Sequence, residues 1–542
     1  SFKNILLFYL VCLFISCDSK NTTSFKDLKN AFVQWNKKNH IDTDYDFTHN
    51  YFKRYNITLI DQYIEDLKRF DLELSQVNLN DLENDLRIDY VIINNKISKY
   101  LFEMTINDFT RYEAISFIED VFISIDLLIN MDIELYSKVQ LLESHLKNVS
   151  SFIRDYKKII YLSEDSRKSM FNKKIISLIS FVNKIPTNLN LINDDYSQIQ
   201  SNINEIVISL NKMNNWIEYD YEFTIIGDNN ISNFDKYNFI IKNLFENNDY
   251  NYESVINFIE TNIKTVQRKL INESILIYNK SNDEPVWVDI SDTINVISWV
   301  KSNKLNSVSI SNNNYLEEFE NAYKFIDDNI STFNLNNYFD ISPIFKENIN
   351  HEIIEDFLYS NNKNIYTVNI ANSTVYNNKY QFNNIIFSKI IPEYNIKNTF
   401  YKNTNSLRHF SNRLTNKGFS LFLENILVLN NYTKDSLYKI NFYINLLEKY
   451  SIVLSQNDLF VNAYTEDKII ENISANNFIS IDESKNILKN INNNDFYIEE
   501  IMVFLHLLNL YEAKCIVNDS MSVSDYIDSI LSNGNIPFYL FN

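Results

Sequence analysis

Glycine and proline are nearly absent from this sequence, which has 3 glycines and 5 prolines in 542 residues. Glycine supplies the positive φ angles of tight turns and proline interrupts helices, so both residues mark where a chain changes direction. Their scarcity excludes collagen-like and multi-hairpin β architectures and favours long helices. Because 45% of the residues are apolar, the chain also has ample material for a large buried core.

The charge balance excludes one broad class of partner. The chain carries 50 basic and 70 acidic residues, a net charge of −20, and contains no block rich in Lys and Arg. A surface that follows nucleic-acid phosphates needs a basic face, so we expect no nucleic-acid partner. We expect the acidity to keep an exposed protein soluble.

The N-terminus reads as a targeting segment. Lys3 provides a positive charge, and residues 5–15 form an apolar run of the length found in signal peptides. The run ends in Ser16-Cys17 and is followed by a polar stretch, which resembles a bacterial lipoprotein signal. We therefore predict a signal peptide over residues 1–16, lipidation of Cys17 and a flexible tether over 17–30. The alternative is a short core helix that happens to end in Cys17.

This prediction implies a location and a first partner. The expected location is the bacterial cell envelope, at the outer membrane or cell surface, and the expected partner is the membrane itself, through the lipid. No later segment has eighteen uninterrupted apolar residues, so we predict no further membrane span.

Helical periodicity dominates the remaining chain. Five apolar residues at spacings of three and four predict a helix face over 255–270, and a similar pattern spans 437–447. One stretch differs, because Tyr366, Val368 and Ile370 alternate with a period of two. This alternation predicts a strand within a small β element around residues 364–387.

The usual catalytic motifs are missing. The sequence has no HExxH, no CxxC, no GxGxxG and no GxSxG. On a helix, His351 and Glu355 would share one face, as two metal ligands must. The alternative is an ordinary amphipathic helix start with solvated acids, which is the commoner origin of such a pair.

A set of short motifs, in order along the chain, is similar to one known family. These motifs are Leu86–Tyr90, Ile185-Pro186, Ile225–Gly227, Lys417–Glu424 and Tyr526–Pro537. In this order they resemble the bacterial domain of unknown function 885, whose members are helical, commonly secreted or lipid-anchored, and zinc-peptidase-like. All three glycines of the chain fall on glycines of the family pattern. The resemblance implies a mainly α, zincin-like body, and IPxxL and LG-type turns at the second and third motifs.

The metal motif of that family, HExxPGHH, is replaced here by residues 388–395, SKIIPEYN. Ser388 and Lys389 stand where the first His and the Glu are expected, and Tyr394 and Asn395 stand at the paired His positions. Lys417 replaces the Glu of the family's second motif. Ser and Asn are poor zinc ligands, and two lysines would repel a dication.

These replacements predict an inactive relative, a pseudoenzyme with no cofactor, that binds peptide or protein ligands in an inherited cleft. The alternative is an active metallopeptidase with a displaced zinc-ligand set, for which the remaining candidates are His351, Glu355, His409 and Glu424. A third reading is a helical envelope protein unrelated to peptidases. We expect an N-terminal helical region over 31–330 and a C-terminal helical region over 331–542 that carries the degenerate motifs.

Overall fold

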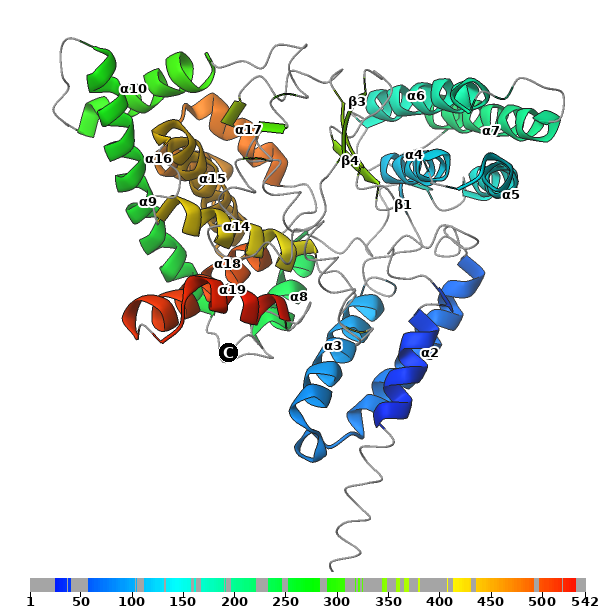
Figure 1. Cartoon of the computed structure of the whole chain (residues 1–542), viewed down its shortest axis with the longest axis horizontal. Coiled ribbons are helices and arrows are strands. Elements are labelled where there is room, and N and C mark those ends of the chain that lie inside the picture. Colours follow the sequence, from blue (N-terminus) through cyan, green and yellow to red (C-terminus); the bar gives the residue numbers. More distant parts are fainter. Residues whose placement is uncertain are drawn as a thin grey trace, which may run out of the picture. The chain divides into compact units, whose positions relative to one another are not determined.

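The computed structural model is mainly α-helical, as the sequence predicts (Figure 1). It describes residues 25–36, 38–39, 57–102, 104, 112–130, 133–156, 160–161, 167–189, 191, 196–220, 233–245, 252–282, 290–307, 317, 320–321, 324, 344–348, 357–360, 365–369, 379–380, 407, 413–429, 435–491, 497–518 and 520–532. In this part of the chain, no helix is long and apolar enough to cross a membrane.

The chain divides into two compact units. Unit 1 comprises Ser1–Asn230 with Lys346–Asn372, and unit 2 comprises Ile231–Phe345 with Ser373–Asn542. The division near residue 230 differs from the boundary at residue 330 that we expected from the sequence. In addition, the segment Lys346–Asn372 belongs to unit 1, so the two units cannot be separated by a single boundary.

Unit 1 begins with three packed helices, which we call the three-helix unit. They are a helix over residues 25–36, α2 (Ile57–Ser75) and α3 (Asn84–Leu101), with the 3₁₀ turn η2 (Leu79–Asp81) between the last two. Phe25, Leu28 and Phe32 are buried at spacings of three and four, which is why the first helix forms against its neighbours. This helix includes residues 25–30 of the expected flexible tether, so the tether prediction is wrong over those residues.

Four further helices of unit 1 form a bundle around one apolar core, which we call the α4–α7 bundle. They are α4 (Ala114–Asn130), α5 (Leu135–Tyr156), α6 (Arg167–Asn188) and α7 (Ser197–Asn215), and α7 continues into the π-helical turn η5 (Trp216–Asp220). Large apolar side chains such as Phe117, Phe171 and Ile203 are completely buried in this core. The expected turn at Ile185-Pro186 is wrong, because both residues lie inside α6, one turn before its end.

Short strands complete unit 1. β1 (Tyr112–Glu113) pairs in parallel with β2 (Ile160–Tyr161). β3 (Ile344–Asn348), β4 (Phe357–Ser360) and β5 (Ile365–Asn369) form a sheet in the order β3-β5-β4, with β4 and β5 antiparallel. β5 confirms the strand predicted from the alternation at 366–370.

Unit 2 is built from helices alone within its described residues, apart from the edge of β3. Its elements are α8 (Asn233–Phe245), α9 (Tyr252–Ser281), α10 (Ile290–Val300), η6 (Lys301–Leu305), α14 (Arg413–Leu429), α15 (Ser436–Phe460), α16 (Glu466–Asn477), α17 (Ile481–Ile491), α18 (Ile498–Tyr511), η11 (Glu512–Val517) and α19 (Val523–Ser532). The periodicity over 255–270 is confirmed, because Val255, Ile259, Ile263, Val266 and Leu270 all point into the core from α9.

Candidate functional site

Most of the residues singled out from the sequence lie outside the described part of the chain. These are Cys17, His351, Glu355, Ser388, Lys389, Tyr394, Asn395 and His409. Lys417 lies in α14, where only its backbone is described. Glu424 is therefore the candidate whose surroundings are fully defined, and the site is built from it.

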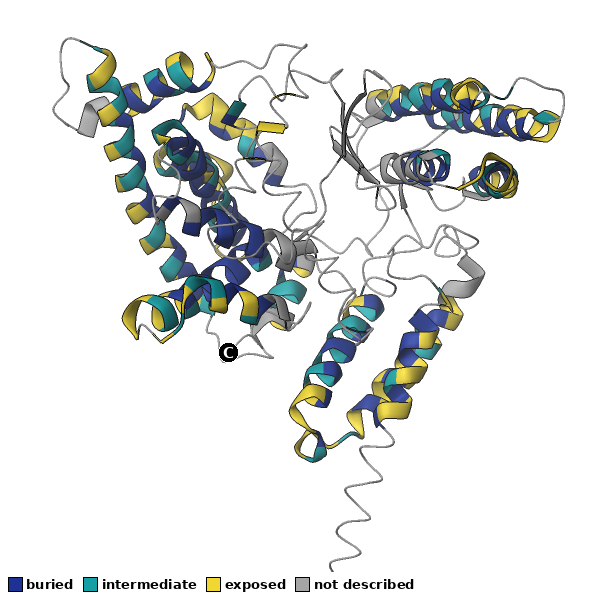
Figure 2. Cartoon of the chain, in the orientation of Figure 1, coloured by how far each residue is buried: buried dark blue, intermediate teal, exposed yellow. Residues whose placement is uncertain are grey.

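The helix that carries Glu424 is enclosed by protein. Every residue of α14 from 418 to 426 is buried, including Ser420, Glu424 and Asn425 (Figure 2). A helix that is buried all round needs apolar residues on every face, and Phe419 to Leu423 supply them. The polar members of this stretch must then find partners inside the protein.

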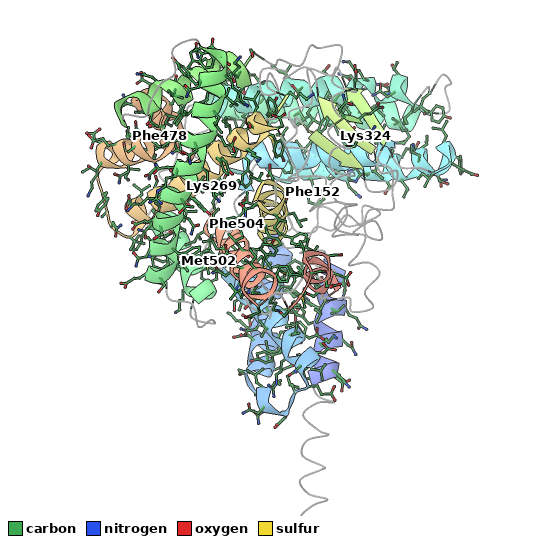
Figure 3. The ribbon with its side chains drawn as sticks, turned by 60° about the vertical axis from the view of Figure 1, so that its left-hand side comes forward. Phe152, Lys269, Lys324, Phe478, Met502 and Phe504 are labelled. Carbon is green, nitrogen blue, oxygen red and sulfur yellow. The ribbon has the colours of Figure 1, made fainter. Side chains whose placement is uncertain are left out.

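Gly418 sets the distance between α14 and α18. A Cβ atom on Gly418 would lie 2.6 Å from the backbone oxygen of Glu500 and 2.6 Å from the Cβ of Val503. Only glycine permits this approach without movement of one helix. The glycine of the Lys417–Glu424 motif thus has a packing role. The α18 side chains Met502 and Phe504 are buried in the same core (Figure 3).

The carboxyl group of Glu424 is fixed by the next helix in the chain. The Tyr438 hydroxyl, in the first turn of α15, donates a hydrogen bond of 2.8 Å to Oε1 of Glu424. Burial raises the pKa of Glu424 to about 8, although this hydrogen bond and the charge of Lys449 act to lower it. Burial, followed by the charge of Glu424, also raises the pKa of Tyr438 well above its ordinary value.

A second buried carboxyl group lies next to the same lysine. Nζ of Lys449, on α15, is 2.5 Å from Oε1 of Glu500, a residue of α18 that is only 2% exposed. The Lys449 ammonium also lies 5.5 Å from the ring centre of Tyr497, at the start of α18. Within the described residues, no group hydrogen-bonds Oε2 of Glu500. We call Glu424, Tyr438, Lys449 and Glu500 the polar core cluster.

The last sequence motif reaches the same core. Tyr526, on α19, is buried, and its hydroxyl donates a 2.8 Å hydrogen bond to the backbone oxygen of Leu507. Its ring lies 5.8 Å from that of Phe422, with the two rings nearly perpendicular. The structure therefore brings together two motifs that are about a hundred residues apart in the sequence.

Sequence reasoning missed three of the four residues in the polar core cluster. Tyr438, Lys449 and Glu500 lie in no recognisable motif. Glu500 is also separated from Glu424 by three helices, α15, α16 and α17. One signal was present for Glu500. It opens a strongly apolar helix, IEEIMVFLHLLNLY, in which a carboxylate at the positive end of the helix dipole is the expected polar exception.

The surroundings of Glu424 do not suit a metal ligand. A zinc ligand must be deprotonated, whereas burial favours the protonated form of Glu424, and Lys449 places a positive charge nearby. Among the described residues, no group of three or more His, Cys, Asp or Glu side chains is arranged to hold a metal ion. The described contacts of Glu424 include the hydrogen bond from the Tyr438 hydroxyl and the nearby charge of Lys449.

The fold and this core define a class, namely a large, mainly α protein with a buried polar cluster. No protein-family model matches the sequence. No curated protein matches it either. The resemblance to the domain of unknown function 885 therefore stays a prediction.

Solved structures do share the fold. A protein from Shewanella oneidensis, classed as a lipoprotein of unknown function, is similar with a TM-score of 0.63 over 95% of this chain and 98% of its own, at 12% identity. A protein from Colwellia psychrerythraea, also classed as a lipoprotein, is similar with a TM-score of 0.62 over 91% of this chain and 90% of its own, at 10% identity. At these identities the likeness establishes the fold alone.

Proposed function

We propose that this chain is a non-catalytic lipoprotein of the bacterial cell envelope, anchored through Cys17, that binds peptide or protein ligands. In this proposal it is a pseudoenzyme derived from the domain of unknown function 885 family, without a metal cofactor. Its place at the outer membrane or cell surface is part of the proposal.

The order of sequence features in residues 1–24 supports the lipid anchor at Cys17. A basic residue, an apolar run, a small residue before Cys17 and a polar stretch follow one another as they do in lipoprotein signals. Similarity of fold to two proteins classed as lipoproteins supports the same proposal.

The absence of catalysis rests on side-chain chemistry. Residues 388–395 replace the family's histidines and glutamate with Ser388, Lys389, Tyr394 and Asn395. A metal-bound hydroxide needs about three nitrogen, oxygen or sulfur ligands, and a general base must stand beside it. The remaining acid of the second motif, Glu424, is occupied by Tyr438. These observations favour a scaffold that keeps the helical body and has lost the hydrolytic chemistry.

Metal content tests the proposal against an active metallopeptidase with displaced ligands. The soluble form that starts after Cys17 is purified without chelators, and zinc is measured by plasma mass spectrometry. The proposal predicts far less than one zinc per chain. About one zinc per chain would instead support ligands drawn from His351, Glu355, His409 and Glu424.

A matched gain-of-function variant tests the sequence alignment. Replacing Ser388→His, Lys389→Glu, Tyr394→His and Asn395→His rebuilds the family pattern. If residues 388–395 occupy the old metal site, this variant binds zinc where the parent does not. A well-folded variant that still binds no zinc would count against the alignment on which the pseudoenzyme rests.

A further inference from the structure

The direction of the first helix relative to α3 follows from two contacts. Nζ of Lys29 lies 2.5 Å from Oδ2 of Asp89, and the Tyr100 hydroxyl donates a 3.4 Å hydrogen bond to Oδ1 of Asn36. The residue numbers of both partners rise together, from 29 to 36 and from 89 to 100, so the helix over residues 25–36 runs parallel to α3. Its first residues therefore lie beside the beginning of α3.

The direction relative to α2 is the opposite. The rings of Phe32 and Phe70 pack edge to face at 5.4 Å, and the Trp35 indole donates a 2.9 Å hydrogen bond to Oδ2 of Asp66. Along the first helix the residue number rises from 32 to 35 while that of the α2 partner falls from 70 to 66, so the first helix is antiparallel to α2. The turn between α2 and α3, residues 75–84, consequently lies at the same end of the three-helix unit as residue 25. Figure 1 shows α2 and α3 packed together with this turn at one end.

The two ends of the three-helix unit differ in what leaves them. Residue 25, to which the segment from Cys17 is joined, lies at the end that holds the 75–84 turn. The rest of the chain, from residue 102 onward, continues from the other end, after α3 has risen about 27 Å at 1.5 Å per residue. Residues 25 and 102, where the chain enters and leaves, thus lie at opposite ends of the three-helix unit.

The reach of the anchor is limited by covalent geometry. The first described helical residue is Phe25, which is eight residues after Cys17. Even when fully extended, these eight residues span about 29 Å at most. Phe25 is completely buried between the helices, so the end of the three-helix unit cannot peel away to lengthen this reach without unfolding it.

The exposed side chains at the 75–84 end suit contact with a neutral lipid surface to which the protein is already anchored. Leu79 is 42% exposed and Leu72 is 62% exposed. The exposed charges at this end are mainly acidic: Asp27, Glu73, Glu83 and Asp85 against Lys26 and Arg87. Anionic headgroups would repel this set, so the attraction to a membrane has to come from the lipid on Cys17 and from the exposed leucines, and not from basic residues.

We propose that the 75–84 turn is the membrane-facing end of the three-helix unit, in contact with the lipid surface. The inference rests on the proposed function, because it needs the lipid on Cys17. It adds which surface meets the membrane and by what chemistry.

The test compares fluorescent labels at the two ends of α3 in the full-length lipidated chain. Cys515 is replaced by Ser, and a single label is placed at Asn80→Cys or, as the matched control, at Lys99→Cys, both of which are exposed positions. The chain is reconstituted in phosphatidylcholine vesicles that carry a headgroup quencher. Circular dichroism and the mass of the acylated N-terminal peptide are recorded for each variant.

The proposal predicts quenching at residue 80 at least about twice that at residue 99, because residue 80 precedes α3 and residue 99 lies about 22 Å along the helix axis from its first residue. Equal quenching, or stronger quenching at residue 99, in an acylated and folded chain would overturn it. An unacylated Cys17 would instead refute the proposed function, and the inference with it, so the two failures are distinguishable. The soluble form that starts after Cys17 should show no quenching at either position.

Discussion

The α4–α7 bundle and the core formed by α14, α15 and α18 each bury an ionisable side chain, and burial shifts the two pKa values in opposite directions. In the bundle, Nε2 of His145 lies 2.9 Å from the Ser124 hydroxyl, which itself donates to the backbone oxygen of Val121. When the Ser124 hydroxyl donates to Val121, the neutral imidazole of His145 donates to Ser124 from Nε2. In the unit 2 core, Glu424 accepts from Tyr438 and lies near the Lys449–Glu500 pair.

The difference shows how burial selects a protonation state. Burial lowers the pKa of His145 to about 4 and raises that of Glu424 to about 8. In both regions the neutral form is favoured, since transfer of a charge out of water is unfavourable. The bundle should therefore lose stability as pH falls from about 6.5 to about 4, and the unit 2 core should lose stability as pH rises from about 4.5 to about 8.

The largest effect should follow from removing the shared cation. Lys449→Met leaves the buried Glu500 carboxylate without its ion pair, and we expect a loss of about 3–5 kcal/mol in the free energy of unfolding of unit 2. Urea unfolding followed by circular dichroism measures it. The double variant Lys449→Met with Glu500→Gln should recover most of the loss, and no recovery would show that the pair is not the cause.

The next effect sharpens the comparison at high pH. Because the folded pKa of Glu424 is raised above its ordinary 4.5, the folded state holds the proton more tightly and stability falls as pH rises from about 4.5 to about 8. Glu424→Gln keeps an acceptor for Tyr438 and should remove this fall, by about 1.4 kcal/mol for each pKa unit removed. Hydrogen exchange of α14 peptides at pH 5 and pH 9 reports it. An unchanged pH slope would contradict the assignment.

The matching effect in the bundle has the opposite sign. The pKa of His145 is lowered from 6.5 to about 4, so the stability of the bundle is fully present above about pH 6.5 and is lost as pH falls toward 4. His145→Gln should flatten this loss, which we expect to be about 2–3 kcal/mol in the parent chain. Hydrogen exchange of α5 peptides measures it, and equal acid sensitivity in parent and variant would refute the prediction.

The smallest effect concerns packing alone. Gly418→Ala places a Cβ against the Glu500 backbone and Val503, so we expect a destabilisation of about 1–3 kcal/mol that does not vary with pH. Thermal unfolding at pH 5 and pH 8 measures it. A variant as stable as the parent would mean that α14 and α18 separate more easily than their contact implies.

Periodic apolar patterns predicted the fold well where one face of an element is buried. The helix face at 255–270 and the strand at 366–370 are both confirmed, because apolar spacing reports which side meets the core. The tether was extended too far because Phe25, Leu28 and Phe32 stand among polar residues that mask a short amphipathic helix. The expected turn at Pro186 is wrong because α6 continues through Pro186 to Asn188.

The site was less predictable, for a physical reason. α15 is buried on nearly all sides, including Asn441, Ser451 and Ser455, so its polar residues do not mark an exposed face. The pairing of Lys449 with Glu500 joins helices separated by α16 and α17. No local pattern encodes such a contact, whereas Glu424 and Gly418 were found because they belong to one short motif.

The most direct test of the central claim, a lipid-anchored envelope protein, is the mass of the N-terminal peptide. The chain is expressed in a bacterial host with residues 1–17 intact, extracted from membranes and analysed by mass spectrometry, with Cys17→Ser as the control. For a lipid-anchored protein we expect that residues 1–16 are removed, that Cys17 is the first residue and carries a diacylglyceryl thioether, and that the variant lacks the lipid. An unmodified Cys17, or a chain that keeps residues 1–16, would contradict it.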